Sequence, residues 1–196
     1  RPGTKMYGVV KTDAYGHGAV PVARTIDRFV CGYAVATVDE ELKLRRHGIE
    51  KEILCLGPVS AGRYQECLEN DISLPMFEYR RAKELSDAAV AEGKTAKIHI
   101  AVDTGMSRIG LFPDEGSVEI VKEIAELPAL RIAGMFTHFA RADETDKTNA
   151  GEQYRRFREF CDDVKAAGVA VPVCHCSNSA GIVELPDFNM DAVRAG

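Results

Sequence analysis

The chain has 196 residues, of which 45% are hydrophobic and 28% are charged, and its formal net charge is −5. This acidic balance disfavours nucleic acid as a partner, because no basic stripe is available to neutralise phosphates. No apolar run approaches the roughly 20 residues that a membrane helix needs. The sequence opens without a methionine, almost directly on its first predicted strand, and ends on Ala195-Gly196 with no closing helix. We therefore expect a fragment of a longer chain.

The six cysteines are spread along the sequence, and several lie in apolar runs. This usage is typical of a reduced protein in which cysteine acts as a small core residue, so we expect a cytoplasmic location. Cys174-His175-Cys176 has one residue between its cysteines. Structural zinc sites usually have two or more residues there and a second pair elsewhere. We therefore expect no metal site.

In chain order, the apolar run Met6–Val10 predicts the first strand, and Lys11 follows it directly. Helical spacing and short apolar runs then alternate. They predict helix 19–29, strand 31–36, helix 38–47, strand 53–57, helix 61–69, strand 72–77 and helix 79–92. Pro75 weakens the prediction for its strand, because proline cannot donate to a strand ladder.

The same patterns continue to the end of the chain. They predict strand 96–102, helix 113–127, strand 130–136, a charged loop 141–148, helix 152–167, strand 169–174 and strand 190–193. Most of these strands are continuous apolar runs, which is typical of a parallel sheet covered on both faces. Eight strands alternating with helices predict an α/β fold, a TIM-type (β/α)8 barrel incomplete at both ends. One domain over 1–196 is expected, with a doubly wound open sheet as the alternative.

Lys11 is the first candidate for chemistry. A lysine desolvated at the end of a buried strand is a usable nucleophile toward an aldehyde, which makes Lys11 a candidate Schiff-base residue. The alternative is an ordinary lysine whose ammonium reaches solvent at the strand end.

Further polar residues follow the later strands, and the carboxyl ends of barrel strands meet at one face, where active sites lie. The candidates, with Lys11, are Tyr15, Arg108, His138, Asn178, Ser179, Arg194 and Gly196. Ser179 near a helix start and the Gly196 amide suit a phosphate. Pyridoxal 5′-phosphate, a phosphate-bearing aldehyde, would satisfy both ends of such a site.

Each of these later residues also has an ordinary structural explanation. Ser179 could be a helix N-cap, and His138 could be a satisfied core histidine. Arg108 could pair with a surface acid and Arg194 with Asp191. Taken together, the candidates favour a functional site, because they gather at one face of the predicted barrel.

Five sequence blocks resemble the bacterial alanine racemase family of fold-type III pyridoxal-phosphate enzymes, and they occur in the order in which that family carries them. They are Lys11–Gly18 (KTDAYGHG), Asp103–Gly110 (DTGMSRIG), Thr137–Asp143 (THFARAD), Asn178-Ser179 and Val193–Gly196 (VRAG). The blocks span nearly all of the chain, and together they are highly specific.

The resemblance implies a role for each candidate. Lys11 would hold the cofactor as an internal aldimine and serve as one of two racemisation bases. Tyr15, Asn178, Ser179 and Gly196 would form the phosphate end of the site. At the ring, Arg108 would bind the phenolic oxygen, His138 would lie against the pyridine, and Arg194 would face the ring nitrogen. A guanidinium has no acceptor to offer, so Arg194 would disfavour protonation of that nitrogen and restrain transamination.

The resemblance also implies a homodimer in the full-length protein, with an amino acid as substrate and D-alanine for peptidoglycan as the product. The second base of the family is a tyrosine from the C-terminal β domain of the partner subunit. Nothing in this chain matches that domain, so we expect the fragment to catalyse little. Ala101 departs from the family pattern, because many members carry a carbamylated lysine at this position.

The alternatives to an alanine racemase are a racemase for serine or another amino acid and, less favoured, a decarboxylase of the same fold type. Two non-enzymatic alternatives are a single-domain pyridoxal-phosphate carrier and an inert barrel fragment.

Overall fold

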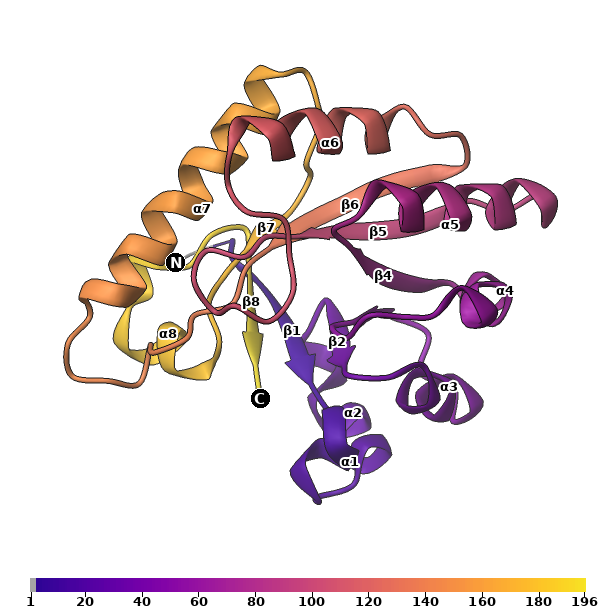
Figure 1. Ribbon diagram of the computed structural model, residues 1–196. Helices are drawn as coiled ribbons and strands as arrows, with labels where there is room; N and C mark the ends of the chain where they lie inside the picture. Colours follow the sequence, from indigo (N-terminus) through magenta and orange to yellow (C-terminus); the bar gives the residue numbers. More distant parts are fainter. Residues whose placement is uncertain (1–2) are drawn as a thin grey trace.

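The computed structural model describes residues 3–196. Within this range eight parallel strands pair in sequence order, and the last pairs with the first, so the sheet closes into a barrel (Figure 1). The strands are β1 Lys5–Val9, β2 Gly32–Val35, β3 Glu52–Cys55, β4 Ile72–Met76, β5 Ala96–Ala101, β6 Leu130–Phe136, β7 Cys174–His175 and β8 Ala192–Ala195. The predicted (β/α)8 barrel is confirmed, and closure excludes the open sheet.

Helical segments connect the strands and cover the outside of the barrel (Figure 1). The helical segments are the left-handed turn α1 Lys11–Tyr15 and the α-helices α2 Ala19–Ile26, α3 Val38–Arg46, α4 Tyr64–Glu69, α5 Tyr79–Ala91, α6 Glu115–Ala125, α7 Thr148–Ala166 and α8 Ser179–Glu184. Three short 3₁₀ segments are η1 Asp27–Phe29, η2 Ala61–Arg63 and η3 Pro186–Phe188. No helix in this part of the chain is long and apolar enough to cross a membrane.

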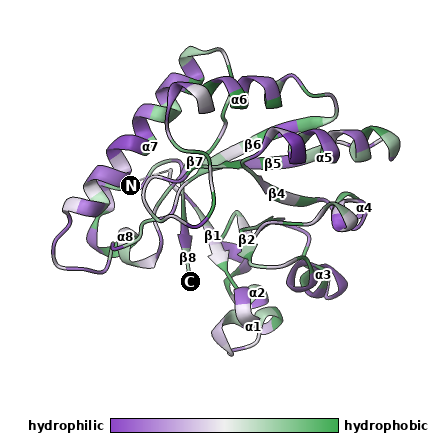
Figure 2. Cartoon of the chain, viewed as in Figure 1, coloured by the Kyte–Doolittle hydropathy of each residue, from purple (hydrophilic) through white to green (hydrophobic). Residues whose placement is uncertain are grey.

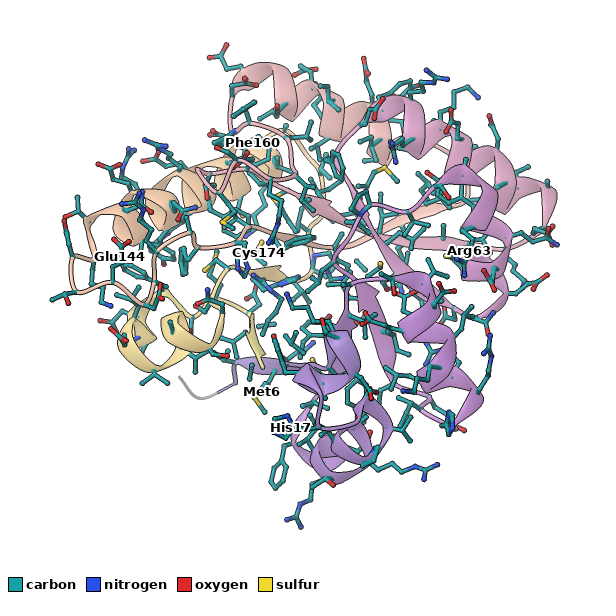
Figure 3. All side chains as sticks on the ribbon, turned by 60° about the horizontal axis from the view of Figure 1, so that its bottom comes forward. Met6, His17, Arg63, Glu144, Phe160 and Cys174 are labelled. Atoms are coloured by element: carbon teal, nitrogen blue, oxygen red, sulfur yellow. The ribbon has the colours of Figure 1, made fainter. Side chains whose placement is uncertain are left out.

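The apolar core lies mainly between the strands and the surrounding helices. Residues of α5, α6 and α7 pack with outward side chains of β4–β6 in the largest cluster, which includes Leu85, Val121, Phe157 and Ile100. Hydrophilic and hydrophobic residues alternate along these three helices (Figure 2). In Figure 3, Cys174 lies near the middle of the molecule, whereas Arg63 and Glu144 lie toward opposite sides.

The predicted strand over 169–174 is wrong in its bounds. The structure has an irregular segment from Val169 to Val173, and only Cys174 and His175 form a strand. Pro172 explains the difference, because it has no N–H for a ladder. Other bounds differ as well, and two of them lie near the site or its loops. The last strand lies two residues later than predicted, at 192–195, and helix α7 begins at Thr148, inside the predicted loop.

The interior of the barrel holds polar side chains, for which small residues leave room. His99 of β5 is fully buried, and it faces Gly134 of β6 at a register shift in the ladder. A Cβ atom at Gly134 would lie 2.6 Å from His99 Nδ1 and 2.7 Å from the Val173 carbonyl oxygen. Glycine at this position therefore makes the space that the imidazole occupies.

We predict that Gly134→Ala destabilises the barrel by about 1–3 kcal/mol, because the added methyl overpacks a site bounded by backbone. Urea unfolding followed by circular dichroism measures the change. Gly116→Ala is the matched control, because Gly116 is exposed in α6 and its nearest contact would be 3.5 Å away. Helix propensity predicts that this control is neutral or stabilising by up to about 1 kcal/mol. Equal stability of Gly134→Ala and the wild type would contradict the packing argument.

Candidate active site

A cavity of about 280 Å³ opens at the carboxyl ends of the strands. Its lining includes every candidate from the sequence: Lys11, Tyr15, Arg108, His138, Asn178, Ser179, Arg194 and Gly196. Ala36, Leu56 and Pro58 complete a less polar wall after β2 and β3. The structure therefore brings together residues from both ends of the chain.

A left-handed turn presents Lys11 and Tyr15 to this cavity. Residues Thr12–Tyr15 all have φ between +53° and +56°, a region that non-glycine residues rarely adopt. Asp13 holds the turn, because its Oδ1 accepts from the Ala19 amide at 2.8 Å and from Lys43 Nζ at 2.7 Å.

Tyr15, Ser179 and Gly196 form one corner of the cavity. The Gly196 amide donates to Ser179 Oγ at 3.0 Å, and that hydroxyl donates to the Gly196 carbonyl at 2.6 Å. A Cβ atom at Gly196 would lie 3.1 Å from the Tyr15 hydroxyl and 2.6 Å from the Cβ of Val9. Glycine thus brings a backbone amide and two hydroxyl groups into a tight corner.

Asn178, and not Ser179, caps helix α8. Its Oδ1 accepts from the Gly181 amide at 3.0 Å, and its backbone is extended. This leaves the Ser179 hydroxyl at the cavity corner, so the N-cap explanation for Ser179 is wrong. Asn178 lines the cavity but uses its amide oxygen for the cap.

Arg194 lies at the floor of the cavity, and its side chain is buried. Its Nη2 donates to the Thr137 carbonyl at 2.7 Å, and its Nη1 contacts His175 Nδ1 at 2.7 Å. Asp191, the partner in the alternative explanation, instead accepts from the Cys174 amide at 2.8 Å, so the ion-pair explanation for Arg194 is wrong. Burial, opposed by the nearby Cys176, lowers the pKa of Arg194 to about 10, which keeps it charged at neutral pH.

The cavity carries positive charge. His138 is flanked by Arg194, Arg108 and Lys11, and burial together with these three cations lowers its pKa to about 3. His138 is therefore neutral at pH 7. Arg108 is exposed on the loop after β5. A neutral imidazole among three cations suits a ligand that brings negative charge of its own.

Three further polar residues lie behind Arg194, and the sequence alone did not identify them as part of the site. His175 contacts Arg194 directly, His99 contacts His175 at 3.0 Å, and Glu52 lies beyond His99. The available signal was a histidine inside the apolar run of β5, since buried polar residues require partners.

Comparison with known proteins identifies the family of this chain. The model of the alanine racemase N-terminal domain matches residues 1–196. An alanine racemase of Clostridium novyi is 45% identical over 193 residues, which are 98% of this chain and 50% of that protein. An alanine racemase of Clostridium tetani is 39% identical over 195 residues, which are 99% of this chain and 50% of that protein. The chain thus spans about half the length of the curated relatives it matches.

Solved structures agree with the sequence comparisons. The alanine racemase of Clostridium difficile 630 superposes with a TM-score of 0.98 at 38% identity, covering 100% of this chain and 52% of that one. The alanine racemase of Bacillus anthracis with bound L-Ala-P has a TM-score of 0.92 at 35% identity, covering 100% and 51% respectively.

The neutral state of His138 generates a prediction about pH. The unfolded chain protonates this histidine below a pKa of about 6.5, whereas the folded chain does so only near 3. Between these values the unfolded state binds more protons, so the free energy of unfolding falls as pH decreases, by about 1.4 kcal/mol per pH unit. His138→Asn should remove this contribution. Urea titrations at several pH values between 6 and 4.5 measure both slopes, and equal slopes would contradict a buried neutral His138.

Proposed function

The chain belongs to the alanine racemase N-terminal domain family, and on that premise we propose that it is the pyridoxal 5′-phosphate-binding barrel domain of an alanine racemase. The complete enzyme would interconvert L-alanine and D-alanine, with D-alanine used for peptidoglycan precursors. The observation that carries the proposal is the convergence of Lys11, Tyr15, Ser179 and Gly196 on one cavity. The unpaired state of the six cysteines supports a cytoplasmic enzyme.

The residues present fit the cofactor. Tyr15, Ser179 and the Gly196 amide supply hydrogen-bonding groups in a corner too tight for a Cβ atom at Gly196, as a phosphate cradle requires. Lys11 lies in the same cavity, where an aldehyde would meet its Nζ. The cavity cations complement the negative charges of the phosphate and of a substrate carboxylate.

When bound, pyridoxal phosphate withdraws electrons from the alpha carbon of an attached amino acid, which acidifies the alpha proton. Lys11 Nζ would hold the cofactor covalently at rest. Once displaced by the substrate amine, the same Nζ would take or return the alpha proton on one face. One side chain would thus serve both as anchor and as base.

The remaining residues would position the ring. Arg194 offers only N–H donors, so it would donate to the ring nitrogen and leave that nitrogen unprotonated. His138, neutral and next to Arg194, would lie against the ring face. Arg108 would donate to the phenolic oxygen. Ala101, buried at the end of β5, has no amine for a carbamate, so Arg108 would be oriented without that anion.

Racemisation needs a base on each face of the alpha carbon, and Lys11 supplies one. The second would be a tyrosine from the C-terminal domain of a partner subunit in a homodimer. The length of the relatives, about twice that of this chain, supports such a further domain in the complete protein.

The first test is the absorbance of the protein after addition of pyridoxal phosphate. We expect a band at about 420 nm from a lysine-bound cofactor, and we expect Lys11→Ala to abolish it. Lys122→Ala is the control, because Lys122 pairs with Glu119 on the surface of α6, away from the cavity. A band that persists in Lys11→Ala would refute the assignment of the anchor.

The second test compares racemase rates of the complete protein and of residues 1–196. The shorter chain would lack one of the two bases, so we expect its rate to be lower by about 10²–10⁴-fold. The conversion of L-alanine into D-alanine measures both rates. Comparable rates in both would show that the two-base account is wrong for this protein.

A further inference from the structure

A chain of polar side chains crosses the interior of the barrel below the cavity. It runs from Arg194 on β8 to His175 on β7, His99 on β5 and Glu52 on β3. The successive contacts are Arg194 Nη1 to His175 Nδ1 at 2.7 Å, His175 Nε2 to His99 Nδ1 at 3.0 Å, and His99 Nε2 to Glu52 Oε1 at 3.4 Å. Both histidines have no solvent exposure, and Arg194 is 3% exposed.

The Arg194 guanidinium determines which atom donates in each hydrogen bond of this series. A guanidinium carries only donors, so His175 Nδ1 must accept and the His175 proton must lie on Nε2. That N–H donates to His99 Nδ1, so the His99 proton also lies on Nε2 and points to Glu52. A carboxylate only accepts, so the Glu52 end demands the same direction.

Glu52 is built to remain an acceptor. Its Oε2 accepts from the Tyr7 hydroxyl at 2.8 Å, and its Oε1 accepts from Ser73 Oγ at 2.8 Å. Burial opposes ionisation, but the hydrogen bonds from His99, Tyr7 and Ser73 outweigh it and hold the pKa of Glu52 below its usual value. The chain therefore ends on a negative charge at neutral pH.

The opposite end carries a buried positive charge with neutral acceptors. Arg194 donates to the carbonyl oxygens of Thr137 at 2.7 Å, Cys176 at 3.1 Å and His175 at 3.2 Å. Glu52 is the carboxylate to which the hydrogen-bond chain leads. Two imidazoles thus join a buried cation to its counter-charge across the barrel.

The imidazole planes are held by aromatic neighbours. Phe136 stacks on His175 with ring centroids 5.4 Å apart and an interplanar angle of 18°. The Tyr7 ring is tilted by 33° relative to His175, with centroids 5.5 Å apart. A protonated His99 would have to donate to His175 Nε2, which would turn the His175 Nδ1 proton against the Arg194 donors. The hydrogen-bond series from Arg194 to Glu52 therefore allows one arrangement of the imidazole protons, with each ring protonated on Nε2.

We infer that Glu52, His99 and His175 are positioning residues for Arg194. Their hydrogen bonds, which all donate in the direction from Arg194 to Glu52, fix the position of the guanidinium at the cavity floor. They also connect its positive charge to the negative charge of Glu52. In the setting of the proposed function, on which this part rests, the chain fixes the donor that faces the cofactor ring nitrogen.

The direct test uses cofactor-free protein and long-range ¹H–¹⁵N correlation spectra of the histidine rings at pH 7. We expect both His99 and His175 as neutral Nε2–H tautomers, assigned with His99→Gln and His175→Gln. Glu52→Leu removes the terminal acceptor, so the His99 Nε2–H loses its partner and the resonances of the His99 ring should shift, whereas Arg194 should keep His175 as the Nε2–H tautomer. Glu52→Gln retains an oxygen acceptor and should keep the wild-type pattern.

Glu41→Gln is the matched control. Glu41 is a fully buried acid on α3 with no hydrogen-bond partner for its carboxyl oxygens in the described chain, and the substitution should leave both rings unchanged. An Nδ1–H or doubly protonated ring in the wild type would overturn the inference. So would Glu52→Leu spectra identical to the wild type. The wild-type result remains decisive if Glu52→Leu fails to fold.

A second readout separates this inference from the proposed function. Titration with pyridoxal phosphate should show binding weakened by about tenfold or more in Glu52→Leu, as expected when a supporting hydrogen bond to a ligand-binding group is lost. Glu41→Gln should bind like the wild type. Equal binding by Glu52→Leu would overturn the positioning role, whereas failure of the wild type to bind pyridoxal phosphate would refute the proposed function and leave the tautomer result intact.

Discussion

The closing ladder between β1 and β8 is the constraint on which the site depends. Tyr7 pairs with Arg194 and Gly8 with Ala195 in this parallel ladder, so both strands end at the same height. Lys11 and Tyr15, which follow β1, therefore meet Arg194 and Gly196, although they lie at opposite ends of the sequence. An open sheet with the same strands would leave these two groups at opposite edges, and neither would form a site alone.

Closure also creates an interior that this chain fills in an unusual way. Barrel interiors are commonly packed with bulky branched residues. Here Glu52, His99, His175 and Arg194 occupy much of that space, beside small residues such as Gly134. The larger apolar clusters lie outside, under the helices. Stability thus comes mainly from the outer layer, which leaves the interior free to support a charged group at the cavity floor.

The residues that could be predicted from the sequence are those governed by local pattern. Apolar periodicity located the strands and most helices, and polar residues directly after strands identified the lining of the cavity. The left-handed turn could not be predicted, because Thr12, Ala14 and Tyr15 carry no signal for positive φ. Strand β7 was misplaced because Pro172 interrupts a run that is otherwise typical of a strand. His99 and Glu52 were missed because their partners lie on non-adjacent strands, and their role follows only from the closed barrel.

The turn that carries Lys11 has a cost that falls on the rest of the fold. Left-handed backbone costs roughly 1–2 kcal/mol for each non-glycine residue, so Thr12–Tyr15 together store roughly 4–8 kcal/mol. That is comparable to the whole stability of a typical domain, about 5–15 kcal/mol. The hydrogen bonds that Asp13 accepts from the Ala19 amide and from Lys43 Nζ connect this strained turn to α2 and α3. Because strain lowers the free energy of local opening, we expect the amides of the turn to exchange hydrogen before those of the strands. Lys11 thus directly precedes a strained turn, whereas the strands beside it form a closed barrel.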